Sequence, residues 1–92
     1  MDNTAKWNMM EKMLRELDDI INSQTSLLKK ITQLEADNIN LGNRLLEKRL
    51  PDIHSKVDEA LTEATTVKEE FSEVRDKFVS DNKLNEPTEG VA

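Results

Sequence analysis

The sequence predicts an all-α protein of two long helices that form a coiled coil or helical bundle, with a hinge, kink or turn near residues 38–52. Three observations predict this class. Apolar residues recur at alternating spacings of four and three, which is the pattern of a heptad seam. The 92 residues include only two glycines and two prolines, too few for a sheet protein with many turns. Charged residues make up 35% of the chain and aromatic residues 3%, a composition typical of long helices with exposed polar faces.

A first amphipathic helix is expected over residues 5–41, after a short polar lead of residues 1–4. Up to Ile31 about three positions in seven are apolar, a width that suits a three- or four-helix bundle. This width arises because a second heptad frame, through Met13, Ile20, Leu27 and Leu34, overlaps the first. The interface residues predicted from the first helix are Trp7, Met10, Leu14, Leu17, Ile21, Gln24, Leu28, Ile31 and Asn38.

Two features of this first helix each have two interpretations. Gln24 and Asn38 are amides at seam positions, where they either fix the register of the assembly or lie hydrated at the seam edge. Near the start, Trp7 and three methionines form an apolar cluster. The cluster is either a docking surface for a partner or the first layer of an ordinary bundle core.

Residues 42–52 are expected to form the hinge or kink between the helices. Asparagines and Gly42 favour turns and helix ends over helix interiors. Pro51 would kink a helix or begin a new one, and the heptad frame changes in the same region. Whether this segment is a hinge, a kink or a tight turn stays open at this level.

The second helix is expected over residues 53–80 and carries the clearest seam of the chain, kept for eight positions without a break. Glu63 with Lys68, and Glu70 with Arg75, stand five residues apart and would meet across the strands of a parallel self-pair. Residues 81–92 lose the heptad period and are expected to form a disordered acidic tail. The interface residues predicted here are Leu46, Leu50, Ile53, Val57, Ala60, Ala64, Val67, Phe71, Val74 and Phe78.

The sequence contains no candidate catalytic residues. Carboxylates are plentiful in the second helix, but a di-iron bundle site also needs Glu-x-x-His pairs, and the residue three before the single His54 is Pro51. No glycine-rich phosphate loop or nucleophile turn is present. His54 is either a pH-sensing residue beside the break or an ordinary surface histidine. We therefore expect no enzymatic activity, no metal site and no cofactor.

The net charge of −6 disfavours direct binding to nucleic acid and to anionic lipid surfaces. The chain has no cysteine and no apolar run long enough to span a bilayer, and its first residues lack an apolar signal core. We expect a soluble intracellular protein of the cytoplasm or nucleus, with no membrane insertion and no small-molecule substrate. Its expected partners are other helical proteins.

The favoured function is that of a coiled-coil subunit that scaffolds or tethers within a hetero-oligomeric helical complex. If the two helices did not fold back on each other, they would reach roughly 110 Å at 1.5 Å per residue. One alternative is a small regulatory or inhibitory protein that folds on its target. Another is a parallel homo-oligomeric coiled coil. A solitary compact monomer that shields Val67, Phe71 and Phe78 internally would contradict all three.

Overall fold

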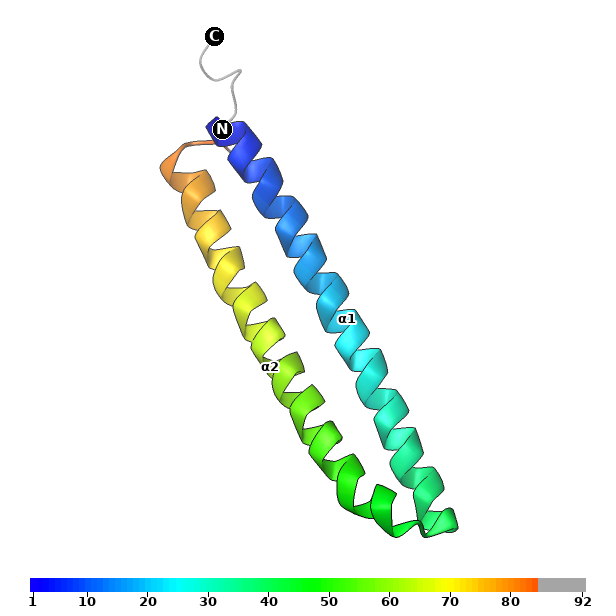
Figure 1. Cartoon of the computed structure of the whole chain (residues 1–92). Helices are drawn as coiled ribbons and strands as arrows, with labels where there is room; N and C mark the ends of the chain where they lie inside the picture. The colour runs from blue at the N-terminus through cyan, green and yellow to red at the C-terminus, as the bar shows by residue number, and fades with distance from the viewer. Residues whose placement is uncertain (85–92) are drawn as a thin grey trace.

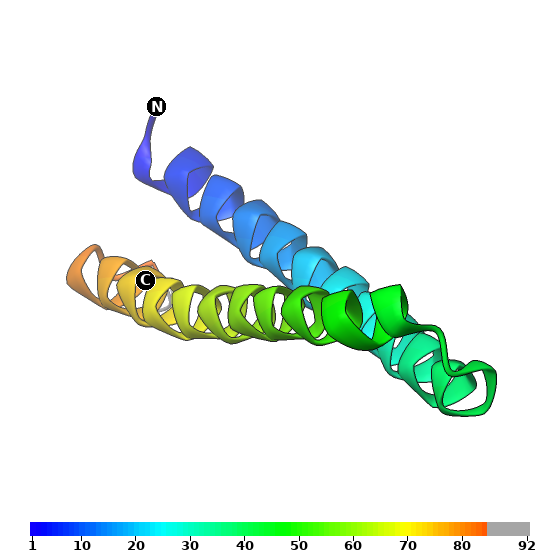
Figure 2. The same cartoon turned by 60° about the horizontal axis from the view of Figure 1, so that its bottom comes forward.

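The computed structural model describes residues 1–84 and consists of two antiparallel helices joined by a tight turn (Figure 1). α1 runs over Asn3–Leu41 and α2 over Arg44–Asp81. The view in Figure 2 shows the turn in front, with both helices running back from it. The predicted all-α class is confirmed, and the chain folds back on itself as a helical hairpin.

α1 is long because nothing in its sequence interrupts it. Asp2 caps its start: the Oδ1 atom accepts a hydrogen bond of 2.7 Å from the Ala5 N–H, which satisfies one of the free donors of the first turn. No glycine or proline occurs between Asn3 and Leu41. The helix therefore continues for 39 residues, about 58 Å at 1.5 Å per residue.

The turn is built by Asn38, Gly42 and Asn43. Gly42 has a φ of 70°, the left-handed conformation that glycine adopts without steric cost, and its N–H donates to the Asn38 carbonyl at 2.7 Å. Asn43 then caps α2, because its Oδ1 accepts from the Leu46 N–H at 3.0 Å. One helix ends and the next begins within two residues.

The break is thus shorter than the segment 42–52 expected from the sequence. α2 begins at Arg44, not near residue 53, and continues through Pro51. A proline cannot donate to the carbonyl four residues earlier, and Pro51 is tolerated here on an exposed side of the helix. Of the expected tail, residues 85–92 lie outside the described residues.

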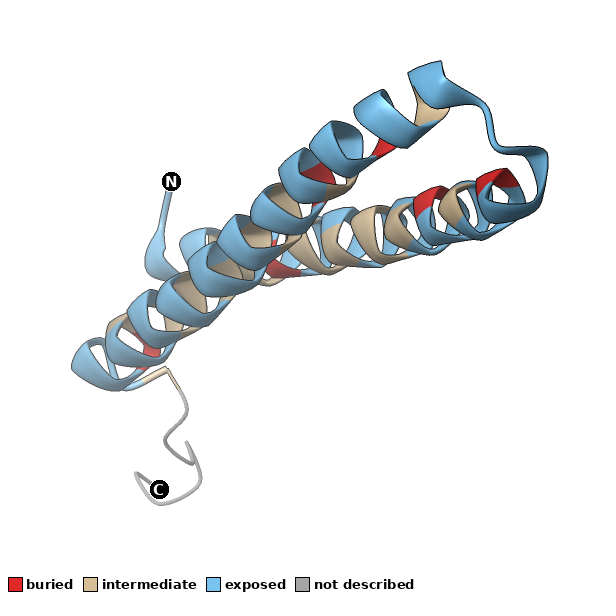
Figure 3. Cartoon of the chain, turned by 90° about the horizontal axis from the view of Figure 1, so that it is seen from below, coloured by how far each residue is buried: buried red, intermediate tan, exposed pale blue. Residues whose placement is uncertain are grey.

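The core of the hairpin is a narrow band between the helices. The apolar residues with the least exposed surface are Leu14 and Ile31 of α1 and Leu50, Val57 and Val79 of α2. Figure 3 shows buried and half-buried residues on the sides of the helices that face each other, with exposed residues over the rest. Within residues 1–84, neither helix has a stretch that is long and apolar enough to cross a membrane.

Candidate interaction surface

The inner seam is the set of residues through which α1 and α2 pack against each other. From α1 it contains every interface residue predicted for that helix. Each is buried or half-buried, so this predicted interface lies within the chain. These residues are Trp7, Met10, Leu14, Leu17, Ile21, Gln24, Leu28, Ile31 and Asn38.

The inner seam of α2 differs from the seam predicted for it. Val57, Ala64, Phe71 and Phe78 are buried or half-buried as expected, and Leu46 and Leu50 precede them. Between them the predicted members were Ile53, Ala60, Val67 and Val74. Ala60 is half-buried, but the other three are 47%, 51% and 52% exposed. The half-buried residues in the intervening layers of α2 are His54, Leu61, Lys68 and Arg75.

Three of these four residues are polar, and each meets a carboxylate of α1. Arg75 Nη1 donates to Glu11 Oε1 at 2.5 Å, and Lys68 forms an ion pair with Asp18. A hydrogen bond of 2.6 Å joins His54 Nδ1 to Glu35 Oε1. Long basic side chains can cover apolar surface with their stems while the charged group reaches the edge.

The pKa values of the Arg75 and Glu11 side chains reflect this contact. The hydrogen bond from Arg75, aided by its positive charge, holds the pKa of Glu11 below the usual 4.5. In turn, hydrogen bonds to Glu11 and then Asp76 raise the pKa of Arg75. Both shifts favour the charged forms of the two groups, which join the first turns of α1 to the last turns of α2.

These contacts define one side of the hairpin, here called the polar face. Its residues flank the inner seam on the side where α2 cations reach α1 carboxylates, and hollows along this flank are lined by residues of both helices. Thr65 and Ser72 of α2 lie there together with Asp18 of α1. The polar face comprises Glu11, Asp18, Thr25 and Thr32 of α1 and Asp58, Thr65 and Ser72 of α2.

The opposite flank of the inner seam is apolar and is here called the apolar face. Met13 follows Glu11 by two residues, which turns its side chain by about 200° to the other flank. The same step leads from Ser72 to Val74 on α2. Because the polar flanks of the two helices meet, the other two flanks also meet. The apolar face comprises Met13, Ile20, Leu27 and Leu34 of α1 and Ile53, Ala60, Val67 and Val74 of α2.

The apolar face is regular along its length and only partly covered. Its α1 residues repeat every seven positions and are 42–50% exposed. The ion pairs set the register, so Met13 lies near the level of Val74, and Ile20 near that of Val67. Leu27 and Leu34 lie correspondingly near Ala60 and Ile53. Four apolar layers therefore follow one another along a single side of the hairpin.

The two seam amides have different environments. Asn38 is 8% exposed, and its side chain both donates to the Asn43 carbonyl and accepts from the Asn43 N–H, each at 3.0 Å. Its buried amide thus fixes the turn within the chain. Gln24 has a buried Oε1 atom that accepts no hydrogen bond from the described residues. This atom lies in the inner seam, next to the apolar face at Ile20 and Leu27.

The cluster around Trp7 divides between the two predicted roles. Trp7 and Met10 are half-buried in the inner seam, and the Trp7 Nε1–H donates to Glu11 at 3.3 Å. Met9 and Met13 stay 42% and 44% exposed. The cluster is therefore the first layer of the hairpin core on one side, and part of its outer surface on the other.

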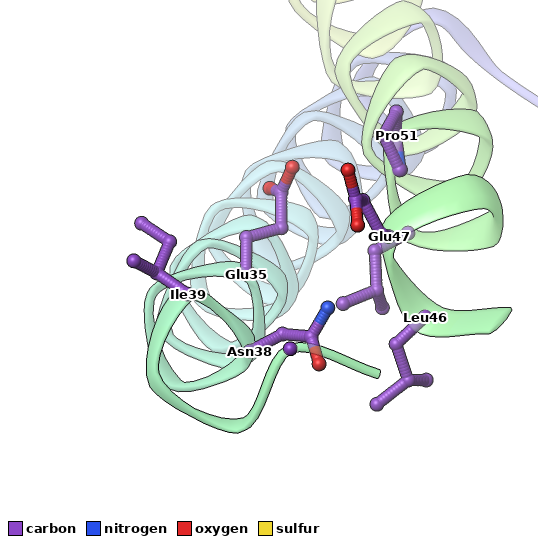
Figure 4. Close-up of a pocket in the computed structure, with 8 residues that line it drawn as sticks. Glu35, Asn38, Ile39, Leu46, Glu47 and Pro51 are labelled. Atoms are coloured by element: carbon purple, nitrogen blue, oxygen red, sulfur yellow. The ribbon is translucent and has the colours of Figure 1, made fainter. Parts of the chain in front are cut away.

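A hollow beside the turn is the other concave feature of interest (Figure 4). Asn38 points into the space between the helices, whereas Ile39 points outward. Glu35 and Glu47 also line the hollow, and Glu35 is already bound to His54. Across residues 1–84, no group of three histidine or carboxylate side chains is arranged to hold a metal ion.

The role of Lys68, Arg75 and their α1 partners was not predicted from the sequence. Lys68 and Arg75 were assigned to a parallel self-pair with Glu63 and Glu70, but in the hairpin they bind Asp18 and Glu11. A signal was present, because both the two cations and the two carboxylates are spaced by seven residues. Compared with known proteins, the chain matches no family model, no curated protein and no solved structure.

Proposed function

We propose that this chain is a non-enzymatic structural subunit that assembles with further helices through its apolar face. The observation that carries the proposal is the periodic exposure of that face. Met13, Ile20, Leu27 and Leu34 recur every seven residues on one side and remain 42–50% exposed. Isolated exposed apolar residues are common on protein surfaces, but a continuous apolar patch indicates an interaction site.

The spacing of the apolar face also suits a helical partner. Residues that repeat every seven positions along two neighbouring helices form knobs and holes for further helices. The wide apolar face up to Ile31 predicted a bundle of three or four helices. The inner seam uses only part of that width, so the apolar face leaves room for one or two additional helices.

Site-specific photo-cross-linking tests this function. A photoreactive amino acid is placed at Ile20, on the apolar face, and in a matched variant at Thr32, on the polar face. Both positions are on α1 and are exposed to solvent. The proposal expects adducts with a polypeptide from Ile20 in the native host, with the attachment sites mapped to a helix, and few or none from Thr32.

Two outcomes of the cross-linking experiment would contradict the proposal. Equal yields at Ile20 and Thr32 would show that the apolar face has no preferred role. An absence of adducts at Ile20 in an intact, helical protein would show that it does not bind a polypeptide. Repeating the experiment at Val67 and Thr65 tests the same two faces from α2.

A further inference from the structure

We propose that the apolar face binds a second copy of this chain, with the two hairpins antiparallel and their turns at opposite ends. This inference rests on the proposed function and names the occupant of the same surface. The complex would be a four-helix bundle with a two-fold axis perpendicular to the long axis of the hairpin. Such a symmetric interface brings the same patch of both subunits together.

The size of the apolar face is sufficient for a stable dimer. From Met13 to Leu34 it follows α1 for 21 residues, about 32 Å, and it spans two helices of about 10 Å each. This gives on the order of 600 Å², at the lower end of the roughly 600–1,000 Å² per partner of a standard protein interface. A single additional helix would cover only part of it.

The apolar layers are compatible with a two-fold axis at their centre. In α1 the centre falls between Ile20 and Leu27, and in α2 it falls between Ala60 and Val67. The axis would place Met13 against Leu34 and Ile20 against Leu27 of the second copy. On α2 the small Ala60 would meet Val67 of the second copy. Every layer thus remains apolar, so packing alone allows the antiparallel arrangement.

The charges beside the apolar face select this orientation. Glu16 and Lys30 of α1 lie at nearly equal distances on either side of the centre, as do Lys56 and Glu70 of α2. An antiparallel dimer places α1 against α1, so Glu16 would face Lys30 of the second copy. It also places α2 against α2, so Lys56 would face Glu70. Four pairs of opposite charge would border the interface.

A parallel dimer, with both turns at one end, would reverse these pairings. It places α1 against α2, so Glu16 would face Glu70 and Lys30 would face Lys56. Those are four contacts between like charges. The parallel form would gain only the attraction between Asp37 and Arg49 of the second copy. Like charges that face each other disfavour the parallel arrangement, as the attractive pairs favour the antiparallel one.

The antiparallel form has three unfavourable charge contacts of its own, two of which are related by the two-fold axis. Glu63 lies beside the centre of α2 and would face Glu63 of the second copy. Farther out, Arg49 would face Lys77. Glu63 and Lys77 are exposed, so solvent screens their repulsion. The central carboxylates give the proposal a distinctive test, because neutralising Glu63 should tighten a dimer in this orientation.

Gln24 provides an independent observation at the same place. Its Oε1 atom is buried without a hydrogen-bond donor among residues 1–84, and an unsatisfied buried acceptor is costly. Gln24 lies within one residue of the centre, on the seam column that borders the apolar face. The two-fold axis brings both Gln24 side chains to the same level. Each amide carries a donor and an acceptor, so the pair can satisfy each other once the Gln24 side chain turns from the inner seam towards the apolar face.

Sedimentation equilibrium of the purified full chain tests self-association. We expect a concentration-dependent mass of twice the 10.6 kDa of the chain at micromolar concentrations. Ile20→Glu with Val67→Glu should give a helical monomer, and the matched polar-face variant Thr32→Glu with Thr65→Glu should remain a dimer. Glu63→Gln should tighten the dimer severalfold. A monomer at all concentrations, or a trimer, would overturn the inference.

Cross-linking tests the orientation, because the natural chain has no cysteine. Ser23 lies beside the centre of α1 and would face Ser23 of the second copy only in the antiparallel dimer. A short bismaleimide should therefore join two Ser23→Cys chains, but not two chains of the outward-facing control Ser26→Cys. In a parallel dimer Ser23→Cys would instead join to Glu63→Cys, and that outcome would overturn the orientation.

The two proposals fail in different ways. If the purified chain is monomeric but Ile20 cross-links to another polypeptide in the native host, the proposed function stands and the homodimer is wrong. If Ile20 forms no adduct with any polypeptide, including the chain itself, both are wrong.

Discussion

Arg75 and Glu11 are 64 positions apart in the chain, yet the guanidinium Nη1 donates to the carboxylate Oε1 at 2.5 Å. This contact joins the third turn of α1 to the last turns of α2, at the end of the hairpin opposite the connecting turn. Together with Lys68 and Asp18 it sets the register of the helices.

Glu11 should make the stability of the hairpin depend on pH. Its pKa is lower in the folded state than the usual 4.5, mainly because Arg75 donates to it. Its contribution is therefore present above pH 4.5 and is lost as the pH falls through the lowered folded value. Thermal melts should show Glu11→Gln less stable than the natural chain at neutral pH. This difference should vanish in acid, whereas the exposed Glu59→Gln should show no such difference.

Gly42 should be sensitive to substitution because of its backbone conformation. Its φ of 70° disfavours other side chains, although an added Cβ would meet nothing within 4 Å. The cost of Gly42→Ala is then conformational and amounts to about 1 kcal/mol. Gly42→Asn should cost less, because asparagine tolerates the left-handed region better than alanine. Urea denaturation at fixed protein concentration measures both, and an unchanged stability for Gly42→Ala would refute the assigned turn.

Asn38 should stabilise the turn through its side chain. Asn38→Ala removes both hydrogen bonds to Asn43 and leaves partly buried backbone groups without partners. We expect a loss of about 1–3 kcal/mol in the free energy of unfolding. The exposed Asn40 two residues later is the control, and Asn40→Ala should change stability little. Similar losses for both variants would mean that helix propensity, and not the hydrogen bonds between Asn38 and Asn43, accounts for the effect.

The inner seam should be more sensitive to truncation than the exposed surface of the same helix. Ile31 is 4% exposed and Ile39 is 83% exposed, so the two form a matched pair. Ile31→Ala should destabilise the hairpin by about 3 kcal/mol, because buried isoleucine truncations cost about 2–5 kcal/mol. Ile39→Ala should change the free energy of unfolding by less than about 0.5 kcal/mol. Chemical denaturation of both variants checks the difference.

The two helices and the position of the break could be predicted because local chemistry determines them. The heptad spacing requires helices, and the asparagines and Gly42 require an end between them. The exact length of the break could not be predicted from Pro51, since a proline on an exposed side can be accommodated within a helix. Asn43 caps α2 upstream of Pro51, so the helix begins before the proline.

The interface predicted for α2 differs from its inner seam for a different reason. Columns through Ile53 and through His54 alternate equally well with Val57 at spacings of three and four, so periodicity cannot separate them. The series through Ile53, Val67 and Val74 was predicted as the seam because its residues are apolar. The structure instead places Lys68 and Arg75 towards α1, where carboxylates are available. Only the partner helix, with Asp18 and Glu11 at matching intervals, distinguishes the two columns.

The hydrogen bond of 2.9 Å between Asn3 and Asn82 has a consequence for anything attached to this chain. Groups linked at Asn3 and Asn82 would lie side by side, so a single hairpin cannot hold them apart at a fixed distance. Its reach is the single helix length of about 58 Å, half of what the extended chain would offer. Two such hairpins packed side by side in opposite orientations would instead carry attachment points at both ends of the bundle, about one helix length apart.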